Sequence, residues 1–255
     1  MPHVVGTNGA RRMSPGSPTL LIATPTADGI AMAGYVEALA GLLLRLGEVG
    51  IRATFRTLDG DNLILQRNLL VREFLASQAS HLLFIDSDMT FPADLAEKLL
   101  ATGKPLIGAV YPKRRLDLAG LRRHLDGASF DDAFALAQDW NVQFESGRIT
   151  PSGALARVQG LPGGFLLIER QVFTLMQGRA DVAAMAGAPD APLSFFRELR
   201  QVRTAIDLDY GFCRRYADSG GEVWAYLDAD IRHIGEERNA PPYQAFLDAI
   251  GARPA

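Results

Sequence analysis

The sequence has little of several features that would place it in a structural class at once. Its 255 residues include one cysteine, Cys213, so no disulfide can form within the chain, as is typical of a reducing compartment. The formal net charge is only −3, with 26 Lys and Arg against 29 Asp and Glu. A general nucleic-acid coat protein is usually basic, so we expect no nucleic-acid partner.

Long apolar runs are also missing. The nearest, from Ile30 to Leu44, is interrupted by Glu37 and falls short of the ~20 apolar residues that a membrane span needs. Residues 1–18 are rich in Gly, Pro, Ser, Asn and Arg, and they lack the apolar centre of a signal peptide. We therefore expect a cytoplasmic protein without a transmembrane segment, either free or held at the inner face of the membrane.

The rest of the composition is that of an ordinary globular protein. Hydrophobic residues make up 48% and charged residues 22% of the chain. A chain of this size buries about three-quarters of its unfolded surface, so it needs neither disulfide nor metal merely to fold. We expect a flexible N-terminal tail over residues 1–18, a single domain over 19–240 and a C-terminal tail over 241–255.

Short apolar runs alternate with helical patterns through the first half of the chain. Strands are predicted at 19–24, 51–58, 81–85 and 105–110, and helices at 31–46, 61–77 and 94–101. In the second half we predict strands at 164–168, 223–226 and 231–234, helices at 169–176 and 207–219, and a loop at 180–192. Residues 116–162 lack a clear period and predict a loop with a few short strands. This alternation predicts an α/β fold with a mostly parallel, Rossmann-like central sheet and helices on both faces.

The clearest chemical signal directly follows the apolar run 81–85. Asp86, Ser87 and Asp88 would lie at the carboxyl end of that strand, where open α/β sheets bind ligands. Two neighbouring carboxylates are costly unless a cation neutralises them, and their hard oxygens suit Mg²⁺ or Mn²⁺. A helix cap with turn acids is the alternative reading of this segment.

Several short motifs in order give the sequence a family resemblance. It resembles nucleotide-sugar glycosyltransferases with the GT-A fold, most closely the bacterial family-2-type enzymes, from about Leu20 to Gly235. The matching segments are Ile22–Thr26, Gln66–Asn68, Leu82–Asp88, Tyr111–Lys113, Gly163–Ile168, Asp209–Arg215 and His233–Gly235.

The resemblance implies roles for the acidic residues and for one histidine. Asp86-Ser87-Asp88 looks like the DxD motif, in which Asp88 would bind the metal and Asp86 the donor's ribose or sugar. His233 looks like a late ligand of the same ion. Asp209 matches the family's general base, but Leu208 stands where the family usually has Glu, so Asp207 is the alternative base.

The remaining candidates would bind the donor. The resemblance implies that the segment Thr24, Pro25 and Thr26 cradles the nucleotide base, and that Gly163 and Gly164 let the backbone approach a sugar. Two basic side chains are further donor-binding candidates because of their positive charge. Arg67 is a natural partner for a diphosphate or a carboxylate, although a solvated helix face explains it equally well. Lys113 belongs to a basic cluster that is either a solvated loop or a lid over phosphates.

These features predict a metal-dependent glycosyltransferase that moves a sugar from a nucleotide-diphosphate donor to an acceptor hydroxyl. Inversion follows from the family-2 likeness alone, and retention stays open. One alternative is a haloacid-dehalogenase-type phosphatase with Asp86 as nucleophile and Asp88 as general acid. Another is a catalytically weak nucleotide-sugar-binding protein, which Leu208 motivates. The donor sugar, the nucleotide and the acceptor are not named by the sequence.

Overall fold

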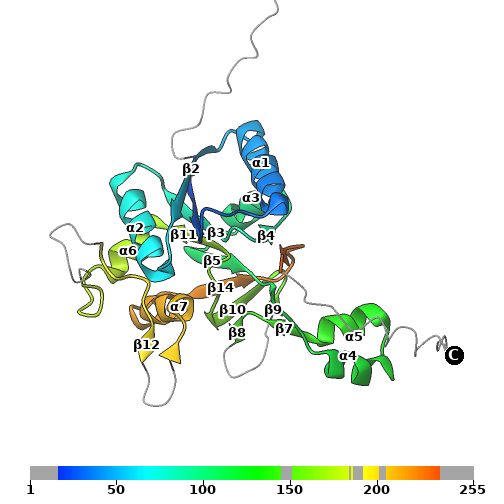
Figure 1. Ribbon diagram of the computed structural model, residues 1–255. Helices are drawn as coiled ribbons and strands as arrows, with labels where there is room; N and C mark the ends of the chain where they lie inside the picture. Colours follow the sequence, from blue (N-terminus) through cyan, green and yellow to red (C-terminus); the bar gives the residue numbers. More distant parts are fainter. Residues whose placement is uncertain (1–16, 145–150, 184, 186–191, 201–204, 236–255) are drawn as a thin grey trace, which may run out of the picture.

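A nine-stranded sheet forms the centre of the molecule (Figure 1). The structure, a computed structural model, describes residues 17–144, 151–183, 185, 192–200 and 205–235. Within these residues the strand order is β2-β1-β3-β11-β5-β14-β10-β8, with β9 also paired to β10. The strands are β1 (Thr19–Thr26), β2 (Arg52–Asp59), β3 (His81–Ile85), β5 (Leu106–Ala109), β8 (Gln143–Phe144), β9 (Pro151–Ser152), β10 (Leu155–Gly160), β11 (Phe165–Glu169) and β14 (Val223–Tyr226).

Most strands of this sheet point the same way. The ladders β1–β2, β1–β3 and β5–β14 are parallel, whereas β11 runs antiparallel to β3 and β5, and β10 runs antiparallel to β14, β8 and β9. Only β10 and β11 are therefore reversed among the described strands. The prediction of a mostly parallel α/β sheet is confirmed.

Helices cover both faces of the sheet, as predicted (Figure 1). Because successive strand residues point to opposite faces, Leu20 and Ile22 of β1 pack against α1 and α3, while Leu21 and Ala23 pack on the side of α2, α6 and α7. The helices are α1 (Ala33–Glu48), α2 (Leu63–Ala76), α3 (Leu95–Ala101), α6 (Arg170–Met176) and α7 (Leu208–Asp218). No helix in the described part of the chain is long and apolar enough to cross a membrane.

The segment 116–162 differs from its prediction as a loop with short strands. It contains two helices, α4 (Leu118–Leu125) and α5 (Phe130–Leu136), which form a lobe beside the sheet (Figure 1). Both begin at ordinary caps: Asp117 accepts a hydrogen bond from the Gly120 amide at 2.9 Å, and Ser129 accepts one from the Asp132 amide at 3.2 Å. Their helical period is hard to read because several apolar side chains of this lobe face outward.

Two-stranded ladders complete the fold. They are β4 (Met89–Thr90) with β15 (Arg232–His233), β6 (Pro112–Leu116) with β7 (Gln138–Trp140), and β12 (Leu199–Arg200) with β13 (Ala205–Ile206). Strand β1 extends to Thr26, two residues beyond the predicted strand at 19–24. Pairing with β3 stops at Ala23, so on that side Pro25 has no ladder partner to lose. The predicted tails and much of the 180–192 loop lie outside the described residues.

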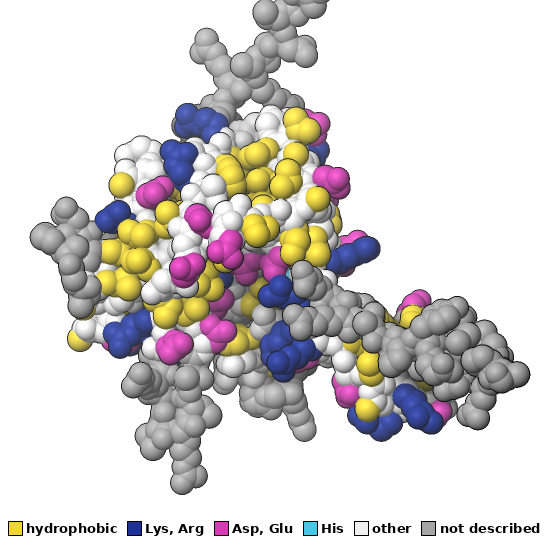
Figure 2. Space-filling view, viewed as in Figure 1, with side chains coloured by type: hydrophobic (Ala, Val, Ile, Leu, Met, Phe, Trp, Pro, Cys, Tyr) yellow, Lys and Arg dark blue, Asp and Glu magenta, His cyan; other side chains and the backbone are white. Residues whose placement is uncertain are grey.

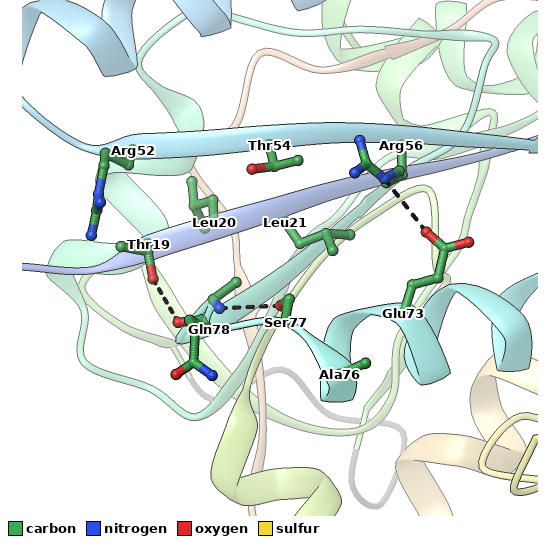
Figure 3. Close-up of a pocket in the computed structure, with 11 residues that line it drawn as sticks. Thr19, Leu20, Leu21, Arg52, Thr54, Arg56, Glu73, Ala76, Ser77 and Gln78 are labelled. Carbon is green, nitrogen blue, oxygen red and sulfur yellow. Dashed lines mark hydrogen bonds and ion pairs between the residues drawn. The ribbon is translucent and has the colours of Figure 1, made fainter.

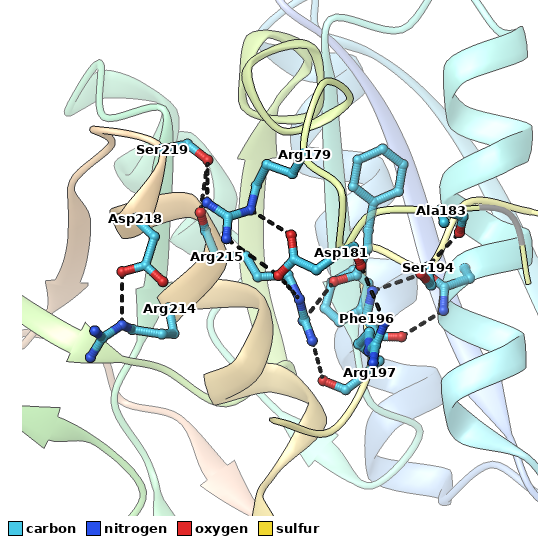
Figure 4. A network of polar contacts seen from close by, with 12 residues as sticks. Arg179, Asp181, Ala183, Ser194, Phe196, Arg197, Arg214, Arg215, Asp218 and Ser219 are labelled. Atoms are coloured by element: carbon cyan, nitrogen blue, oxygen red, sulfur yellow. Dashed lines mark hydrogen bonds and ion pairs between the residues drawn. The ribbon is translucent and has the colours of Figure 1, made fainter. Parts of the chain in front are cut away.

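A buried arginine ties the chain after α6 to α7 (Figure 4). Arg215 is fully buried and donates to the carbonyls of Phe195 (3.2 Å) and Arg197 (3.1 Å), and it lies 3.4 Å from a carboxylate oxygen of Asp181. Arg179 pairs with the same carboxylate at 2.8 Å. These contacts hold the neighbouring Phe195–Phe196 segment against the core, close to the candidate site.

Candidate active site

A cavity of about 430 Å³ lies at the carboxyl ends of the parallel strands. This is the edge where open α/β sheets bind ligands. The sequence-predicted residues that line it are Pro25, Thr26, Arg67, Asp86, Ser87, Asp88, Asp207, Asp209 and His233. Segments far apart in the sequence therefore meet around one cavity.

Arg67 of α2 lies beneath this cavity and contacts two acids. Its Nη2 is 3.2 Å from Asp86 Oδ1, its Nη1 is 3.2 Å from Asp209 Oδ1, and its side chain is only 1% exposed. The guanidinium also packs 5.1 Å from the ring centre of Phe84 and 5.6 Å from that of Phe196. Burial alone would lower the pKa of Arg67, but the carboxylates of Asp209 and Asp86 hold that pKa above its ordinary value. The solvated-face reading of Arg67 is wrong.

The neighbours of Arg67 on α2 are buried as well. Gln66 donates to the carbonyls of Thr26 (2.6 Å) and Leu58 (2.7 Å). Asn68 accepts from the Phe196 amide at 2.9 Å and donates to the Phe196 carbonyl at 2.7 Å. These bonds fix the helix on both sides of Arg67, so the guanidinium has little freedom to move.

Asp209 lies in the first turn of α7, nearly buried. Its Oδ2 accepts a 2.8 Å hydrogen bond from the Gly163 amide, and its Oδ1 faces Arg67. Burial raises the pKa of Asp209 to about 6, although Arg67 opposes the shift. Burial likewise raises the pKa of Asp86, again against Arg67. A carboxylate with a pKa near neutrality is suited to exchanging protons.

Asp207, the alternative base, lies directly before α7. It occupies the N-cap position of α7, but its side chain makes no capping hydrogen bond. The residue is exposed and lines the cavity. Asp207 therefore does not cap the helix through its side chain, and both Asp207 and Asp209 line the same cavity.

Gly163 and Gly164, directly before β11, leave room for side chains from other parts of the protein. A Cβ on Gly163 would overlap the Arg67 guanidinium, and a Cβ on Gly164 would overlap the Tyr111 hydroxyl. The Gly164 amide donates to that hydroxyl at 2.9 Å. Neither glycine is among the cavity's lining residues. The space that the resemblance assigns to a sugar is filled here by Arg67 and Tyr111.

Asp88 and His233 meet because β4 pairs with β15. The Ile234 amide donates to the Asp88 carbonyl at 2.7 Å, and His233 Nε2 lies 3.2 Å from Asp88 Oδ2. On the other side of the ring, Nδ1 contacts the Pro112 carbonyl at 3.3 Å. A carbonyl only accepts, so Nδ1 is the donor in the contact with Pro112, and Nε2 faces the Asp88 carboxylate. Metal-binding histidines commonly donate their other N–H to a carbonyl in the same way.

The donor set fits a hard divalent ion only in part. In the described part of the chain, no group of three or more His, Cys, Asp or Glu side chains is arranged to hold a metal. Asp88 is also paired with Arg114, whose Nη1 lies 3.1 Å from Oδ2. Mg²⁺ commonly binds through one or two carboxylates and takes its remaining ligands from water and substrate phosphates. Asp88 and His233 could supply two ligands of such an open site, while Asp86 lies nearby but is bonded to Arg67.

Two predicted donor-binding residues lie elsewhere. Thr24 is buried within β1, where its hydroxyl bonds to that of Tyr35 at 2.5 Å. Lys113 lies on β6 and pairs with Asp139 at 3.1 Å. Neither lines the cavity.

Sequence reasoning missed several residues of the site. Tyr210 and Asn141 line the cavity, joined by a 2.6 Å bond from the Tyr210 hydroxyl to the Asn141 amide oxygen. Tyr111 and Arg114 also line it. Tyr111 and Tyr210 lie inside motifs that the resemblance singled out. Asn141 follows a segment without a readable period and carried no signal.

Another hollow, of about 530 Å³, lies at the opposite ends of the strands (Figure 3). It is bordered by Thr19 at the start of β1, by Ser77 after α2 and by the exposed pair Arg56–Glu73, whose atoms are 3.6 Å apart. No predicted site residue lines it. Its place away from the carboxyl ends of the strands makes it a poor active-site candidate.

No protein-family profile matches the sequence, and no curated protein matches it significantly. Solved structures with a similar shape include A197 from STIV, at 15% identity, a TM-score of 0.49 and 87% coverage of both chains. The inositol-1-phosphate CTP transferase from T. maritima has 10% identity, a TM-score of 0.40, and 93% coverage of this chain and 97% of its own. A Drosophila galactosyltransferase in complex with manganese, UDP-Gal and xylobiose has 13% identity, a TM-score of 0.43, and coverage of 89% and 79%. These likenesses are too low to carry an argument about function.

Proposed function

We propose that the chain is a metal-dependent glycosyltransferase that uses a nucleotide-diphosphate sugar. The observation that carries the proposal is one cavity holding Asp86, Asp88 and His233 next to an acid pair, Asp207 and Asp209. The first three suit a cation beside a diphosphate. The acid pair suits removal of a proton from an acceptor hydroxyl. The GT-A resemblance assigns the same two tasks to the same segments.

Each residue then has a stated task. Asp88 and His233, helped by Asp86, would hold Mn²⁺ or Mg²⁺, which supplies positive charge against the departing diphosphate. Pro25 and Thr26 border the place where the nucleotide base would lie. Arg67 keeps the carboxyl groups of Asp86 and Asp209 in place from below.

The reaction requires one proton acceptor. The acceptor oxygen forms a bond to the anomeric carbon, the bond from that carbon to the diphosphate oxygen breaks, and its electron pair leaves with the nucleotide. The hydroxyl proton passes to Asp209 or, alternatively, to the more exposed Asp207. A single in-line attack inverts the anomeric carbon. A retaining outcome would point to a different use of these acids.

Nucleotide binding with and without metal tests the proposal. In calorimetric titrations of a panel of nucleotide sugars, at least one should bind in the presence of Mn²⁺ and lose most of its affinity in EDTA. Asp88→Ala should abolish the metal-dependent part and leave thermal unfolding near wild type. Asp126→Ala is the matched control, because that carboxylate is exposed and lies outside the cavity. Equal nucleotide affinity in the wild type and in Asp88→Ala would overturn the metal assignment.

A further inference from the structure

A cavity of about 590 Å³ adjoins the candidate active site and is distinct from the hollow at the opposite ends of the strands. It is the second cavity on the active-site side of the sheet. It lies between β6, β15 and the lobe of α4 and α5, and Arg114 and His233 line both cavities. Figure 2 shows Lys and Arg side chains between the body of the molecule and this lobe, next to a group of acidic side chains. A ligand in the second cavity would therefore reach the first one through the junction at these two residues.

The charge of the second cavity is opposite to that of the first. Four of its lining residues are basic, Lys113, Arg114, Arg115 and Arg232, and none of the described residues that line it is acidic. Lys113 and Arg232 pair with exposed acids outside the lining, and such surface ion pairs are weak. Arg114 pairs with the partly buried Asp88 of the first cavity. Arg115 is exposed and forms no ion pair among the described residues. The cavity thus presents positive charge that no acid within its described lining neutralises.

Apolar side chains form the other part of the lining. Leu118 of α4 and Phe134 of α5 stay 67% and 42% exposed, and Ile231 and Ile234 line the side of β15. Large apolar side chains so exposed beside a cavity mark a place for an apolar ligand group. Four basic side chains beside them suit an anionic group with more than one charge, such as a phosphate monoester, whose oxygens guanidinium groups bind in pairs.

We propose that this cavity binds an acceptor that carries a phosphate monoester on an apolar group. The phosphate would lie against Arg115 and its basic neighbours, and the apolar group against Leu118 and Phe134. The acceptor hydroxyl would then enter the active-site cavity at Arg114 and His233. The inference rests on the proposed function, since it names the substrate class of the same site.

Binding of n-octyl phosphate, measured by calorimetry without metal or nucleotide, tests the phosphate site. It should bind more tightly than inorganic phosphate, and Arg115→Gln should weaken it about tenfold or more, since a charge-assisted hydrogen bond is lost. Arg122→Gln is the matched control, because this exposed arginine of α4 does not line the cavity. Equal affinities in these two variants, or no binding to the wild type, would overturn the proposal.

Leu118→Ser tests the apolar wall. It should weaken n-octyl phosphate and leave inorganic phosphate unchanged, whereas Leu175→Ser, at an exposed leucine of α6, should change neither. An effect of Leu118→Ser on both probes, or on neither, would contradict an apolar subsite.

Sedimentation with vesicles that contain phosphatidic acid distinguishes a lipid-borne phosphate acceptor from a soluble one. Arg115-dependent vesicle binding indicates a lipid-borne phosphate, and binding of n-octyl phosphate alone indicates a soluble one.

Failure of this inference can be told apart from failure of the proposed function. Arg115→Gln should leave Mn²⁺-dependent nucleotide binding within about twofold of wild type, because Arg115 does not line the active-site cavity. Nucleotide binding without any n-octyl phosphate binding would overturn the acceptor site alone. If the wild-type protein binds neither nucleotide sugars with Mn²⁺ nor n-octyl phosphate, the proposed function itself is overturned.

Discussion

Arg67 Nη1 lies 3.2 Å from Asp209 Oδ1, and both atoms are buried without a directed hydrogen bond in the described structure. The contact is therefore held by charge and by the surrounding packing. The same guanidinium donates through Nη2 to Asp86. Arg67 therefore links the acid that follows β3 with the acid at the start of α7. Removing that cation should alter the charge state of both groups at once.

Arg67→Met should lower the free energy of unfolding at pH 7 by about 3–5 kcal/mol, because it leaves buried carboxylates without their partner. The pKa of Asp209 and that of Asp86 should rise further, since Arg67 opposes both shifts. Part of the lost stability should therefore return at pH 5. Denaturant unfolding at both pH values measures this, with Arg122→Met as the control. A loss that is equal at pH 7 and pH 5 would show that Arg67 acts by packing alone.

The raised pKa of Asp209 should make folding stability depend on pH in a stated direction. With a folded pKa of about 6 against an ordinary value near 4, the folded chain binds this proton more tightly than the unfolded chain. Protonation therefore stabilises the fold, and the contribution is lost as the pH rises through about 6. From pH 7 to pH 5 the gain is roughly 1 kcal/mol.

Comparison with Asp209→Asn isolates that contribution. The variant cannot titrate at this position, so the difference in unfolding free energy between wild type and variant should change by roughly 1 kcal/mol between pH 7 and pH 5. Carboxylates remote from Asp209 contribute equally to both proteins and cancel, whereas Asp86 and Asp207 interact with Asp209 and contribute to the difference. A difference that stays constant across this range would contradict the raised pKa.

The sequence predicts the sheet, and the position of the acids that follow β3, because the signals for both are local. An apolar run of strand length followed at once by Asp86 and Asp88 places both acids at a strand end, whatever the rest of the chain does. His233 is different, because only the family resemblance connects it with Asp88. The structure brings these two side chains together by pairing β15 with β4.

Burial of polar residues is what the sequence could not predict. Gln66, Arg67 and Asn68 look like a solvated helix face, since nothing nearby reveals partners as remote as Asp209 and Phe196. The same limit applies to Asp207, which has a capping residue's position but not its hydrogen bond. In each case distant packing overrides a preference that is locally reasonable.

Gly163→Ala should destabilise the fold, because its Cβ would overlap the Arg67 guanidinium, and a shift of that group would disturb its contacts with Asp86 and Asp209. Overpacking of this kind costs about 1–3 kcal/mol. Gly178→Ala is the matched control, since nothing lies within 4 Å of its added Cβ, and it should be nearly neutral. Thermal and denaturant unfolding measure both. Similar stability of the two variants would mean that the Arg67 position is less constrained than its contacts indicate.

The phosphatase alternative makes a separate prediction. In this structure Asp86 Oδ1 accepts from Arg67, and β3 is the third strand in chain order, not the first. With p-nitrophenyl phosphate and Mg²⁺, the protein should therefore release little phosphate. Steady turnover that disappears in Asp86→Asn would favour nucleophilic phosphate chemistry over glycosyl transfer.

The final prediction decides between the two candidate bases. Asp209→Asn keeps the shape of the side chain and can still accept from the Gly163 amide, but it loses the basic carboxylate. We expect transfer to fall by about 10²–10⁴-fold, with nucleotide affinity within about threefold of wild type. In the wild type, transfer should rise with pH through about 6.

Asp207→Asn is the comparison. Its side chain makes no capping bond, so we expect thermal stability close to that of wild type, in contrast to the loss of a true cap. If Asp209 is the base, Asp207→Asn should retain most of the transfer rate. Loss of transfer in Asp207→Asn with a normal rate in Asp209→Asn would move the base to the exposed acid and leave Asp209 as the partner that holds Arg67. Normal rates in both variants would exclude a general base at this end of α7, and a retaining mechanism would then gain support.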